Sequence, residues 1–327
     1  MAENLEYCVV VRTLGMAGEK FRQELESLHR QTVRPKRILV YLAEGYARPS
    51  FTVGMEQYVT VPKGLIAQRA LPYDEVDTDY MLMLDDDVAF PDDGVERLFH
   101  GLKRNAGDCI AIDAFHPQNS AWWQTVYNYL TNLVYPRPDD GWAFKVCGNG
   151  SFSYNRSPHA EVYPSESAAG TCLLWKTSVF RSIRFEDEMW LDRSGYAFGE
   201  DFLMSHKVVR NGYRLLIDYN SGIQHLDAKS ARSDRHLSTD RLCKRSKCQF
   251  LQWYRMFYDA RDLTPRQRRS NLWAWRRRVA QAFLVHVCYA LFTFNAQVVR
   301  MFLKGLKDGR DFVRSDIYKS AKNYIIQ

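Results

Sequence analysis

Short apolar runs alternate with amphipathic helical patterns through the first third of the chain, and this alternation restricts the fold more than any other feature. Two of the runs, YCVVVRTL and KRILVYLA, have the continuous apolar, β-branched character of strands that are buried on both faces. Between them, Phe21, Leu25 and Leu28 recur at helical spacing. Strands that alternate with helices predict an α/β fold with a mostly parallel sheet and right-handed crossovers.

The same alternation continues to residue 115. Three more segments predict strands, namely EQYVTVP, DYMLMLDDD and CIAIDAF. Two others predict helices, namely GLIAQRALPYD and DDGVERLFHGLKRN. The second of these has acidic residues in its first turn and basic residues in its last turn, which favours a helix.

The composition is that of a globular protein with reduced thiols. The chain has 327 residues, of which 46% are hydrophobic, so it can form one large domain or two smaller ones. Its start lacks the basic segment and the long apolar run of a signal peptide. The seven cysteines are scattered and form no CxxC pair. These features predict a cytoplasmic protein.

Charge is distributed unevenly along the chain. Residues 229–327 contain 22 Lys and Arg against 7 Asp and Glu, a balance of +15, whereas residues 1–228 contain 23 against 31, a balance of −8. The net charge of +7 hides this asymmetry. We therefore expect an acidic front domain over residues 1–228 and a basic tail over residues 229–327 that suits an anionic partner.

Three consecutive aspartates directly follow one of the predicted strands. The apolar run YMLML leads into Asp85, Asp86 and Asp87. Ligands of parallel sheets bind beyond the carboxyl ends of the strands, so these acids are expected at a crevice. Neighbouring carboxylates repel one another, and a cation or a metal-bound phosphate would relieve that repulsion. The alternative is a solvated turn with helix-capping acids, although Asp92 and Asp93 already supply such capping.

The order of the motifs resembles that of family-2 glycosyltransferases with the GT-A fold. VVVRTLG resembles the family's first strand and turn, GLIAQRAL its basic helix, and MLMLDDDV its Asp-x-Asp motif. Later, GTCLLWKTSVFRSIRFEDEMW resembles the acceptor-side segment, GYAFGEDFLMSHKVVRNGYRLL the helix that starts with Glu-Asp, and YNSGIQHLD the segment with a metal-binding histidine. The resemblance covers residues 5–228. It implies a Rossmann-like, mostly parallel mixed sheet of the GT-A type with a helical, basic C-terminal extension.

The resemblance implies roles for residues that would bind a nucleotide sugar donor. Asp87 would bind a divalent metal directly, His225 would complete the shell of the metal, and Asp85 would hold the ribose or a metal-bound water. Oxygen ligands suit Mg²⁺ or Mn²⁺, and a histidine ligand favours Mn²⁺. The other residues that the resemblance places at the donor are Thr13, Glu44, Arg69 and Asp86. Alternatively, His225 is an ordinary strand-end histidine, and Arg12 and Arg69 are a surface pair rather than diphosphate contacts.

The sequence also departs from the family pattern. Arg12 stands where the family's turn has a proline, and the second predicted strand ends in a single acid, Glu44, where the family reads the base with an acid pair. The nucleotide base therefore stays open, with a UDP-sugar expected first. Residues 115–168 match no part of the family. Their aromatic side chains either form a platform for an acceptor sugar or belong to the core. These aromatic residues are Trp122, Trp123, Tyr127, Tyr129 and Trp142.

Glycosyl transfer also needs a general base, and the Glu-Asp pair at the start of a predicted helix would supply it. An acceptor hydroxyl loses its proton as it attacks the anomeric carbon, and general-base help contributes about 10²–10⁴ in rate. By resemblance, Asp201 is that base, and Glu200 orients the acceptor or Asp201. Direct displacement of this kind inverts the anomeric centre. The alternative is charge complementarity at a helix N-terminus, which also favours acids.

The tail contains a long uncharged stretch. Residues 279–299 carry no charge over 21 positions, which is long enough to span a bilayer. If this part of the tail forms one continuous helix, its polar residues lie along one stripe of the helix surface and its apolar residues lie outside that stripe. The stripe consists of Arg278, His286, Tyr289, Thr293, Gln297, Arg300, Lys304 and Lys307. The pattern predicts an amphipathic helix in the membrane interface. The alternatives are a spanning helix and a helix packed against the front domain or a second subunit.

These features together predict an inverting, metal-dependent glycosyltransferase. The catalytic domain would be residues 1–228, and the membrane-associated tail residues 229–327. We expect transfer of a hexosyl or N-acetylhexosaminyl group to a glycan or lipid-linked glycan, in surface polysaccharide assembly, at the inner face of the cell membrane.

The enzymatic alternative is a nucleotidylyltransferase, which has no use for the late Glu-Asp pair. The non-enzymatic alternative is a GT-A-like binding module. The broad apolar face of the tail makes nucleic acid an unexpected partner.

Overall fold

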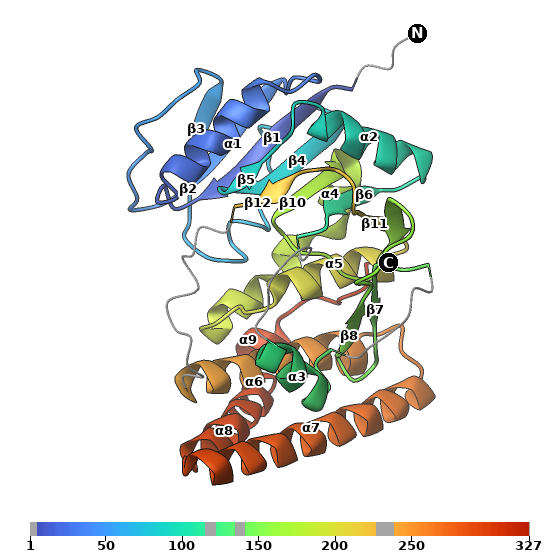
Figure 1. Cartoon of the computed structure of the whole chain (residues 1–327). Coiled ribbons are helices and arrows are strands. Elements are labelled where there is room, and N and C mark those ends of the chain that lie inside the picture. Colours follow the sequence, from blue (N-terminus) through green and yellow to red (C-terminus); the bar gives the residue numbers. More distant parts are fainter. Residues whose placement is uncertain (1–4, 115–121, 135–140, 227–238, 327) are drawn as a thin grey trace.

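The computed structural model describes residues 5–114, 122–134, 141–226 and 239–326. Within these residues, eight strands form one mixed sheet in the order β3–β2–β1–β4–β10–β6–β11–β9 (Figure 1). All neighbouring pairs are parallel except those made by β10 and β9. The mostly parallel sheet predicted from the sequence is therefore confirmed. The strands are β1 (Tyr7–Thr13), β2 (Arg37–Ala43), β3 (Glu56–Val61), β4 (Tyr80–Asp85), β6 (Cys109–Ile112), β9 (Val162–Pro164), β10 (Cys172–Lys176) and β11 (Leu215–Asp218).

The central strands are buried on both faces, which explains their continuous apolar sequences. Along β1, Cys8 and Val10 point into one hydrophobic cluster, whereas Val9 and Val11 point into the other, because successive side chains in a strand face opposite sides. Helices α1 (Glu19–His29) and α2 (Gly94–Arg104) cover the face of Val9. The face of Cys8 is covered by α4 (Thr177–Ile183), the 3₁₀ helix η1 (Phe185–Ser194) and α5 (Glu200–Arg210).

The helix predicted over GLIAQRALPYD is wrong. Residues 65–69 form turns. The backbone N–H groups of Ile66 and Ala67 donate to the carboxylate of Asp192, and Pro72 prevents a helix from continuing. A side chain from a distant segment therefore supplies hydrogen-bond partners that the helical spacing could not reveal.

The C-terminal region is helical and packs against the sheet domain (Figure 1). It contains α6 (Thr239–Tyr254), the π-helix η2 (Arg255–Asp259), α7 (Pro265–Thr293), α8 (Gln297–Phe312) and α9 (Asp316–Lys319). The single continuous tail helix assumed above is wrong, because Phe294 adopts a left-handed conformation with φ of 51° and ends α7. None of the described helices has the length and apolar character needed to cross a membrane.

A buried cluster of three charges joins the C-terminal helices to the sheet domain. Glu188 of η1 accepts from Lys207 of α5 at 3.0 Å and from two nitrogens of Arg255 in η2 at 2.8 and 2.9 Å. Burial by itself would raise the pKa of Glu188, but the charges of Arg255 and Lys207 outweigh it and lower the pKa to about 2. Removal of Glu188 would take away the carboxylate that the buried Lys207 and Arg255 share, so this cluster holds the two regions together.

Candidate active site

The three aspartates lie at the carboxyl edge of the sheet, beside the end of β1. Strands β1 and β4 are parallel and in register, with Arg12 opposite Asp85. Thr13 therefore comes next to the residues that follow β4, and its hydroxyl donates a hydrogen bond to the carboxylate of Asp86. The prediction that the aspartates lie at a strand end holds for Asp85, which ends β4.

Arg12 is buried at this edge of the sheet and contacts Asp85. Its guanidinium lies 2.7 Å from the carboxylate of Asp85, and it also donates to the backbone oxygens of Leu84 at 3.2 Å and Gly170 at 2.7 Å. Burial lowers the pKa of Arg12, as does the nearby charge of Arg69. These contacts use most of the donors of Arg12, so the residue holds Asp85 and two backbone segments in place.

Asp86 carries a strongly perturbed carboxyl group. Burial, reinforced by the charges of Asp85 and Asp87, outweighs the hydrogen bond from Thr13 and raises the pKa of Asp86 to about 6. The carboxylates are thus not neutralised fully by the protein cations around them. A bound cation would reduce the repulsion between these carboxylates.

Asp87 and His225 come together from distant parts of the sequence. Strand β12 (Gln224–His225) pairs with β5 (Val88–Ala89), which places His225 Nε2 3.1 Å from Asp87 Oδ1. Across the described ranges, no group of three or more His, Cys, Asp or Glu side chains is arranged to hold a metal ion. Mg²⁺ is often held by one or two carboxylates together with substrate phosphates, and Asp87 could supply one such carboxylate, while the imidazole of His225 suits a transition metal.

Arg69 connects the aspartates to the Glu-Asp pair. Helix α5 begins after Gly199, and its first turn contains Glu200 and Asp201. The Arg69 guanidinium contacts the Asp201 carboxylate directly, and its Nη2 lies 3.5 Å from both Glu200 Oε1 and Asp85 Oδ1. The structure therefore brings together the two acidic motifs that the sequence keeps far apart.

The two carboxyl groups of the pair have different environments. The side chain of Glu200 is only 7% exposed, whereas that of Asp201 is 31% exposed. Burial and the charge of Asp201 raise the pKa of Glu200 to about 8, although Arg69 opposes the shift. The buried Glu200 therefore holds its proton more strongly than an exposed carboxyl group does, and Asp201 is the carboxyl group that a ligand can reach.

Gly170 allows this cluster to form, and the sequence did not reveal its role. A Cβ atom at position 170 would overlap the guanidinium of Arg69 and the carboxylate of Asp201. Its backbone oxygen accepts the hydrogen bond from Arg12 described above. Only glycine fits here, because its close approach to two charged side chains leaves no space for a side chain of its own.

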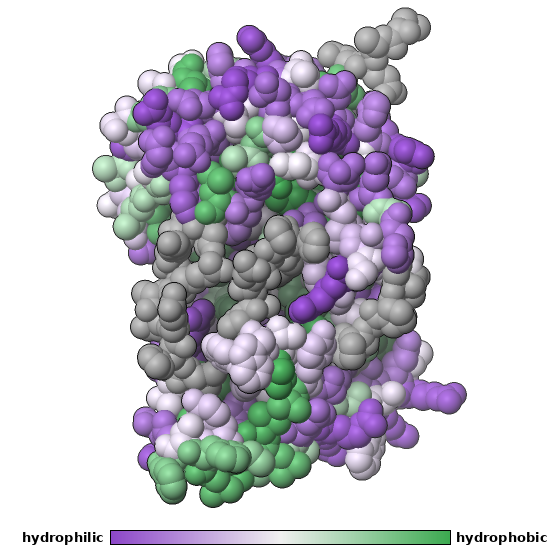
Figure 2. Space-filling view, in the orientation of Figure 1, coloured by the Kyte–Doolittle hydropathy of each residue, from purple (hydrophilic) through white to green (hydrophobic). Residues whose placement is uncertain are grey.

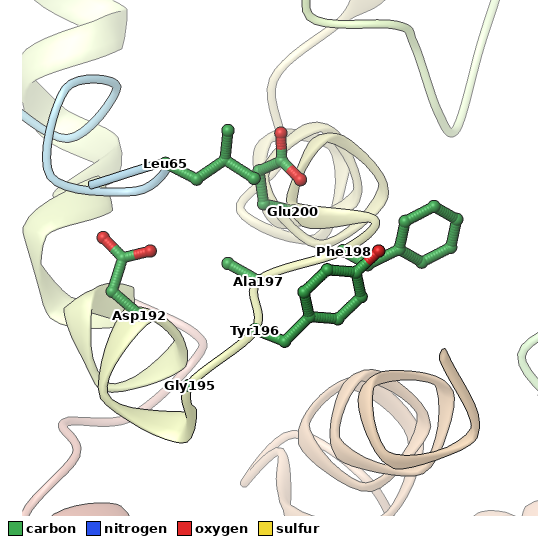
Figure 3. Close-up of a pocket in the computed structure, with 7 residues that line it drawn as sticks. All are labelled: Leu65, Asp192, Gly195, Tyr196, Ala197, Phe198 and Glu200. Carbon is green, nitrogen blue, oxygen red and sulfur yellow. The ribbon is translucent and has the colours of Figure 1, made fainter. Parts of the chain in front are cut away.

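A pocket of about 310 Å³ opens beside Glu200. Figure 3 shows Leu65 and Glu200 on one side of it and the backbone of residues 195–198 on the other. The rings of Tyr196 and Phe198 are parallel, with an interplanar angle of 3° and centroids 6.0 Å apart. The remaining lining residues are Asp192, Gly195 and Ala197. Aromatic rings next to a polar group are suited to a sugar, whose C–H faces pack on rings.

Helix α6 holds the pocket segment in place, a role that the sequence also did not reveal. Lys247 Nζ donates to the backbone oxygen of Ser194 at 2.6 Å, and Gln252 Nε2 donates to that of Phe198 at 2.7 Å. Cys248 Sγ lies 2.8 Å from the backbone oxygen of Tyr196. A helix of the basic tail thus positions the backbone that leads into Glu200.

The other residues proposed from the sequence lie outside this cluster. Glu44 is exposed after the end of β2, and its backbone N–H donates to Val61 at 2.8 Å. Trp122, Trp123 and Tyr127 lie on α3 (Trp122–Leu130), which packs against α7 and does not line the pocket. Trp142 stacks under Lys145 at 3.5 Å. None of these aromatic residues lines the pocket beside Glu200, and their role as an acceptor platform stays a prediction.

Comparison with known proteins identifies the fold. No family model and no curated protein matches the sequence. The solved structure of GalNAc-T7 with UDP, GalNAc and Mn²⁺ is similar, with a TM-score of 0.50 and 14% identity over 88% of this chain. The chain spans 58% of the length of that protein. TarS of S. aureus, residues 1–349 with UDP-GlcNAc, matches with a TM-score of 0.48 and 10% identity over 97% of this chain and 91% of that one. Together with the strand order, the likeness to GalNAc-T7 confirms the predicted GT-A fold.

Proposed function

We propose that the chain is an inverting, metal-dependent glycosyltransferase similar to family 2, which moves a sugar from a nucleotide diphosphate sugar to a hydroxyl group. One observation carries this proposal. Arg69 joins Asp85 at the end of β4 to Glu200 and Asp201 at the start of α5. A donor site and a proton acceptor at one sheet edge are what glycosyl transfer requires, and the GT-A fold supports the assignment.

The aspartates would form the donor half of the site. Asp87 and His225 would hold Mn²⁺ or Mg²⁺, an ion that stabilises the negative charge growing on the leaving diphosphate. Thr13 and Arg12 keep Asp86 and Asp85 in place for the nucleotide. A UDP-sugar is the donor that we expect, because GalNAc-T7 was solved with UDP.

Asp201 would act as the general base. As the acceptor oxygen bonds to the anomeric carbon, its proton passes to the Asp201 carboxylate and the bond to the diphosphate oxygen breaks, which inverts that carbon. Glu200 lines the pocket, and burial favours its protonated form, which would donate a hydrogen bond to the acceptor. A nucleotidylyltransferase or a binding module would have no need for this arrangement.

The pocket beside Glu200 would receive the acceptor. We propose a glycan or a lipid-linked glycan, which fits a surface polysaccharide pathway at the inner face of the cell membrane. The parallel rings of Tyr196 and Phe198 support a sugar in this position. An anionic membrane surface is the second partner, because the +15 balance of residues 229–327 attracts negative charge.

A panel of nucleotide sugars, incubated with the chain and Mn²⁺, tests the function. We expect release of the nucleoside diphosphate from one donor, and its loss in excess EDTA or in Asp87→Ala. Release of pyrophosphate from a nucleoside triphosphate and a sugar phosphate would instead identify a nucleotidylyltransferase. Binding of a donor without turnover, whatever the acceptor, would identify a binding module.

A further inference from the structure

Exposed apolar side chains are concentrated on the C-terminal helices. Among the residues that the structure describes, fourteen large apolar side chains are exposed, and eleven of them lie on α3, on α7, on α8 or between the last two helices. We call these eleven the apolar helical face. They are Trp122, Trp123, Val126, Leu130, Trp273, Leu284, Tyr289, Leu291, Phe292, Phe294 and Leu303. Figure 2 shows hydrophobic residues gathered along the lower edge of the molecule, where α7 ends and α8 begins.

Two members of the polar stripe, Arg278 and His286, point into the protein, which leaves apolar side chains of α7 outside. Arg278 donates to the backbone oxygen of Asn149 at 2.9 Å. His286 lies 2.9 Å from the hydroxyl of Tyr127 and stacks on Phe302. The stripe was expected to face water beside a membrane, but at Arg278 and His286 it contacts protein. As a result, Leu284 and Leu291 on the opposite side of α7 are 62% and 70% exposed.

The turn between α7 and α8 is the most exposed part of this face. Every residue from 291 to 297 is exposed, and Phe292 and Phe294 are 88% and 97% exposed. Phe294 also has a positive φ of 51°, a conformation that costs a bulky L-residue about 1–2 kcal/mol. The side chains of Phe292 and Phe294 therefore bury little apolar surface within the described chain. Their presence points to an apolar environment that the turn enters.

Positive charges flank the apolar helical face. Arg276 and Arg277 are exposed on α7, and Arg300 is exposed on α8. None of the three forms an ion pair with an acid in the described parts of the chain. Between them, residues 279–299 carry no charge. An uncharged surface bordered by unpaired arginines matches the apolar layer and the anionic headgroups of a bilayer.

We propose that the apolar helical face binds a bilayer that contains anionic lipid, with the turn at Phe292 and Phe294 inserted and the three arginines at the headgroups. A second copy of the chain fits less well, because a two-fold contact places the same patch on both sides, and the uncharged residues 279–299 offer the three arginines no acid to pair with. The inference rests on the membrane association proposed above but not on the transfer chemistry. It specifies which surface of the chain contacts the bilayer and which residues enter the lipid.

Vesicle flotation tests this docking surface directly. The full chain is mixed with vesicles of phosphatidylcholine alone or with 30% phosphatidylglycerol, which is the probe composition we choose, and the bound fraction is measured. We expect Phe292→Ser with Phe294→Ser to weaken binding to anionic vesicles at least about tenfold, since each lost ring removes a buried apolar group. Met16→Ser is the matched control, because Met16 is 76% exposed on the sheet domain, away from this face.

Two further variants separate the apolar contribution from the electrostatic one. Arg276→Gln, Arg277→Gln and Arg300→Gln together should weaken binding and reduce its dependence on salt, because fewer lipid charges are then paired. Phe294→Trp should show a blue-shifted emission with anionic vesicles and quenching by brominated lipid. Unchanged emission would contradict insertion of the turn.

The remaining outcomes are also decisive. Equal binding of the wild type and the Phe292→Ser, Phe294→Ser variant would overturn the inference. A wild-type dimer that this variant dissociates in light scattering, without vesicle binding, would identify a second copy as the occupant. A chain that releases the nucleoside diphosphate but ignores vesicles would contradict only the docking surface. A chain that binds vesicles but turns over no donor would contradict only the proposed transferase.

Discussion

Two buried ionic clusters share helix α5, and they differ in balance and in access. At Glu188, one carboxylate faces two cations, and the three side chains are at most 2% exposed. At Arg69, three carboxylates surround one guanidinium, and two of them, Asp85 and Asp201, are about one third exposed. The pKa of Glu188 is lowered to about 2, whereas that of Glu200 is raised to about 8.

The contrast separates an enclosed cluster from one that a ligand can reach. In the Glu188 cluster both cations contact the same carboxylate, and almost no side-chain surface is exposed. In the Arg69 cluster Asp85 is shared with Arg12, and the partly exposed Asp85 and Asp201 lie where the proposed function needs a cation site and a proton acceptor. Substitutions in the first cluster should therefore change stability, and those in the second should change activity.

Asp201→Asn should have the largest effect. It keeps the shape and the contact with Arg69 but removes the proton acceptor, so kcat should fall about 10²–10⁴-fold while donor affinity stays close to wild type. Initial rates and donor titrations measure the two quantities. Asp240→Asn is the control, because Asp240 is also a first-turn acid but lies on the exposed start of α6. An equal loss of donor affinity would place Asp201 in the donor site instead.

Glu188→Gln should destabilise the fold without altering the chemistry. The change leaves Arg255 and Lys207 buried without their counter-charge, which should lower the free energy of unfolding by about 3–5 kcal/mol. Urea unfolding measures this loss, and Glu186→Gln, an exposed position in the same helix, serves as the control. If the folded variant lost activity while remaining stable, the distinction between the two clusters would be wrong.

Glu200→Gln should remove a pH dependence of stability. In the folded chain Glu200 keeps its proton up to a pKa of about 8, whereas an unfolded chain loses it near the ordinary glutamate pKa of 4.5. The unfolded state therefore binds fewer protons between these values, and the stability of the wild type falls as pH rises through that window. The Gln variant mimics the protonated form. Its unfolding free energy relative to wild type should rise by about 2 kcal/mol from pH 6 to pH 7.5. A constant difference would show that Glu200 is ionised throughout.

Gln252→Ala should have the smallest effect, confined to the acceptor side. It removes one hydrogen bond to Phe198 and loosens the backbone before Glu200. We expect kcat/KM for the acceptor to fall about 5–10-fold, equivalent to about 1 kcal/mol, with donor hydrolysis almost unchanged. Gln249→Ala on the same helix is the control. An equal fall in donor hydrolysis would mean that α6 supports the whole site.

Much of the sheet was predictable, as was the position of Asp85 at the end of a strand, because both depend on local signals. Strands β1 and β4 are buried on both faces, so their sequences are continuously apolar and easy to recognise. The carboxyl ends of parallel strands lie along one edge, where the aspartates were expected, and the resemblance placed Thr13 at the same donor site. Their contact through the Asp86 carboxylate agrees with that expectation.

Other features could not be read from local patterns. Asp192 provides the hydrogen bonds that replace the predicted helix at Ile66 and Ala67, from a segment far along the chain. Gly170 and Gln252 act through close approaches that no spacing rule encodes. Each of these depends on how three or more segments pack, which the sequence of one segment does not contain.

The sequence by itself determined which chemical groups the chain has and at which strand and helix ends they lie, because backbone periodicity and capping are local. Only the tertiary structure decided which of these groups meet. It placed Arg69 between two acidic motifs and brought α6 into contact with the backbone beside the pocket. It also directed Arg278 and His286 of α7 toward protein rather than water. An amphipathic helix can direct either face inward, and the choice follows from the partners that the buried side finds, since unpaired polar groups are costly to bury.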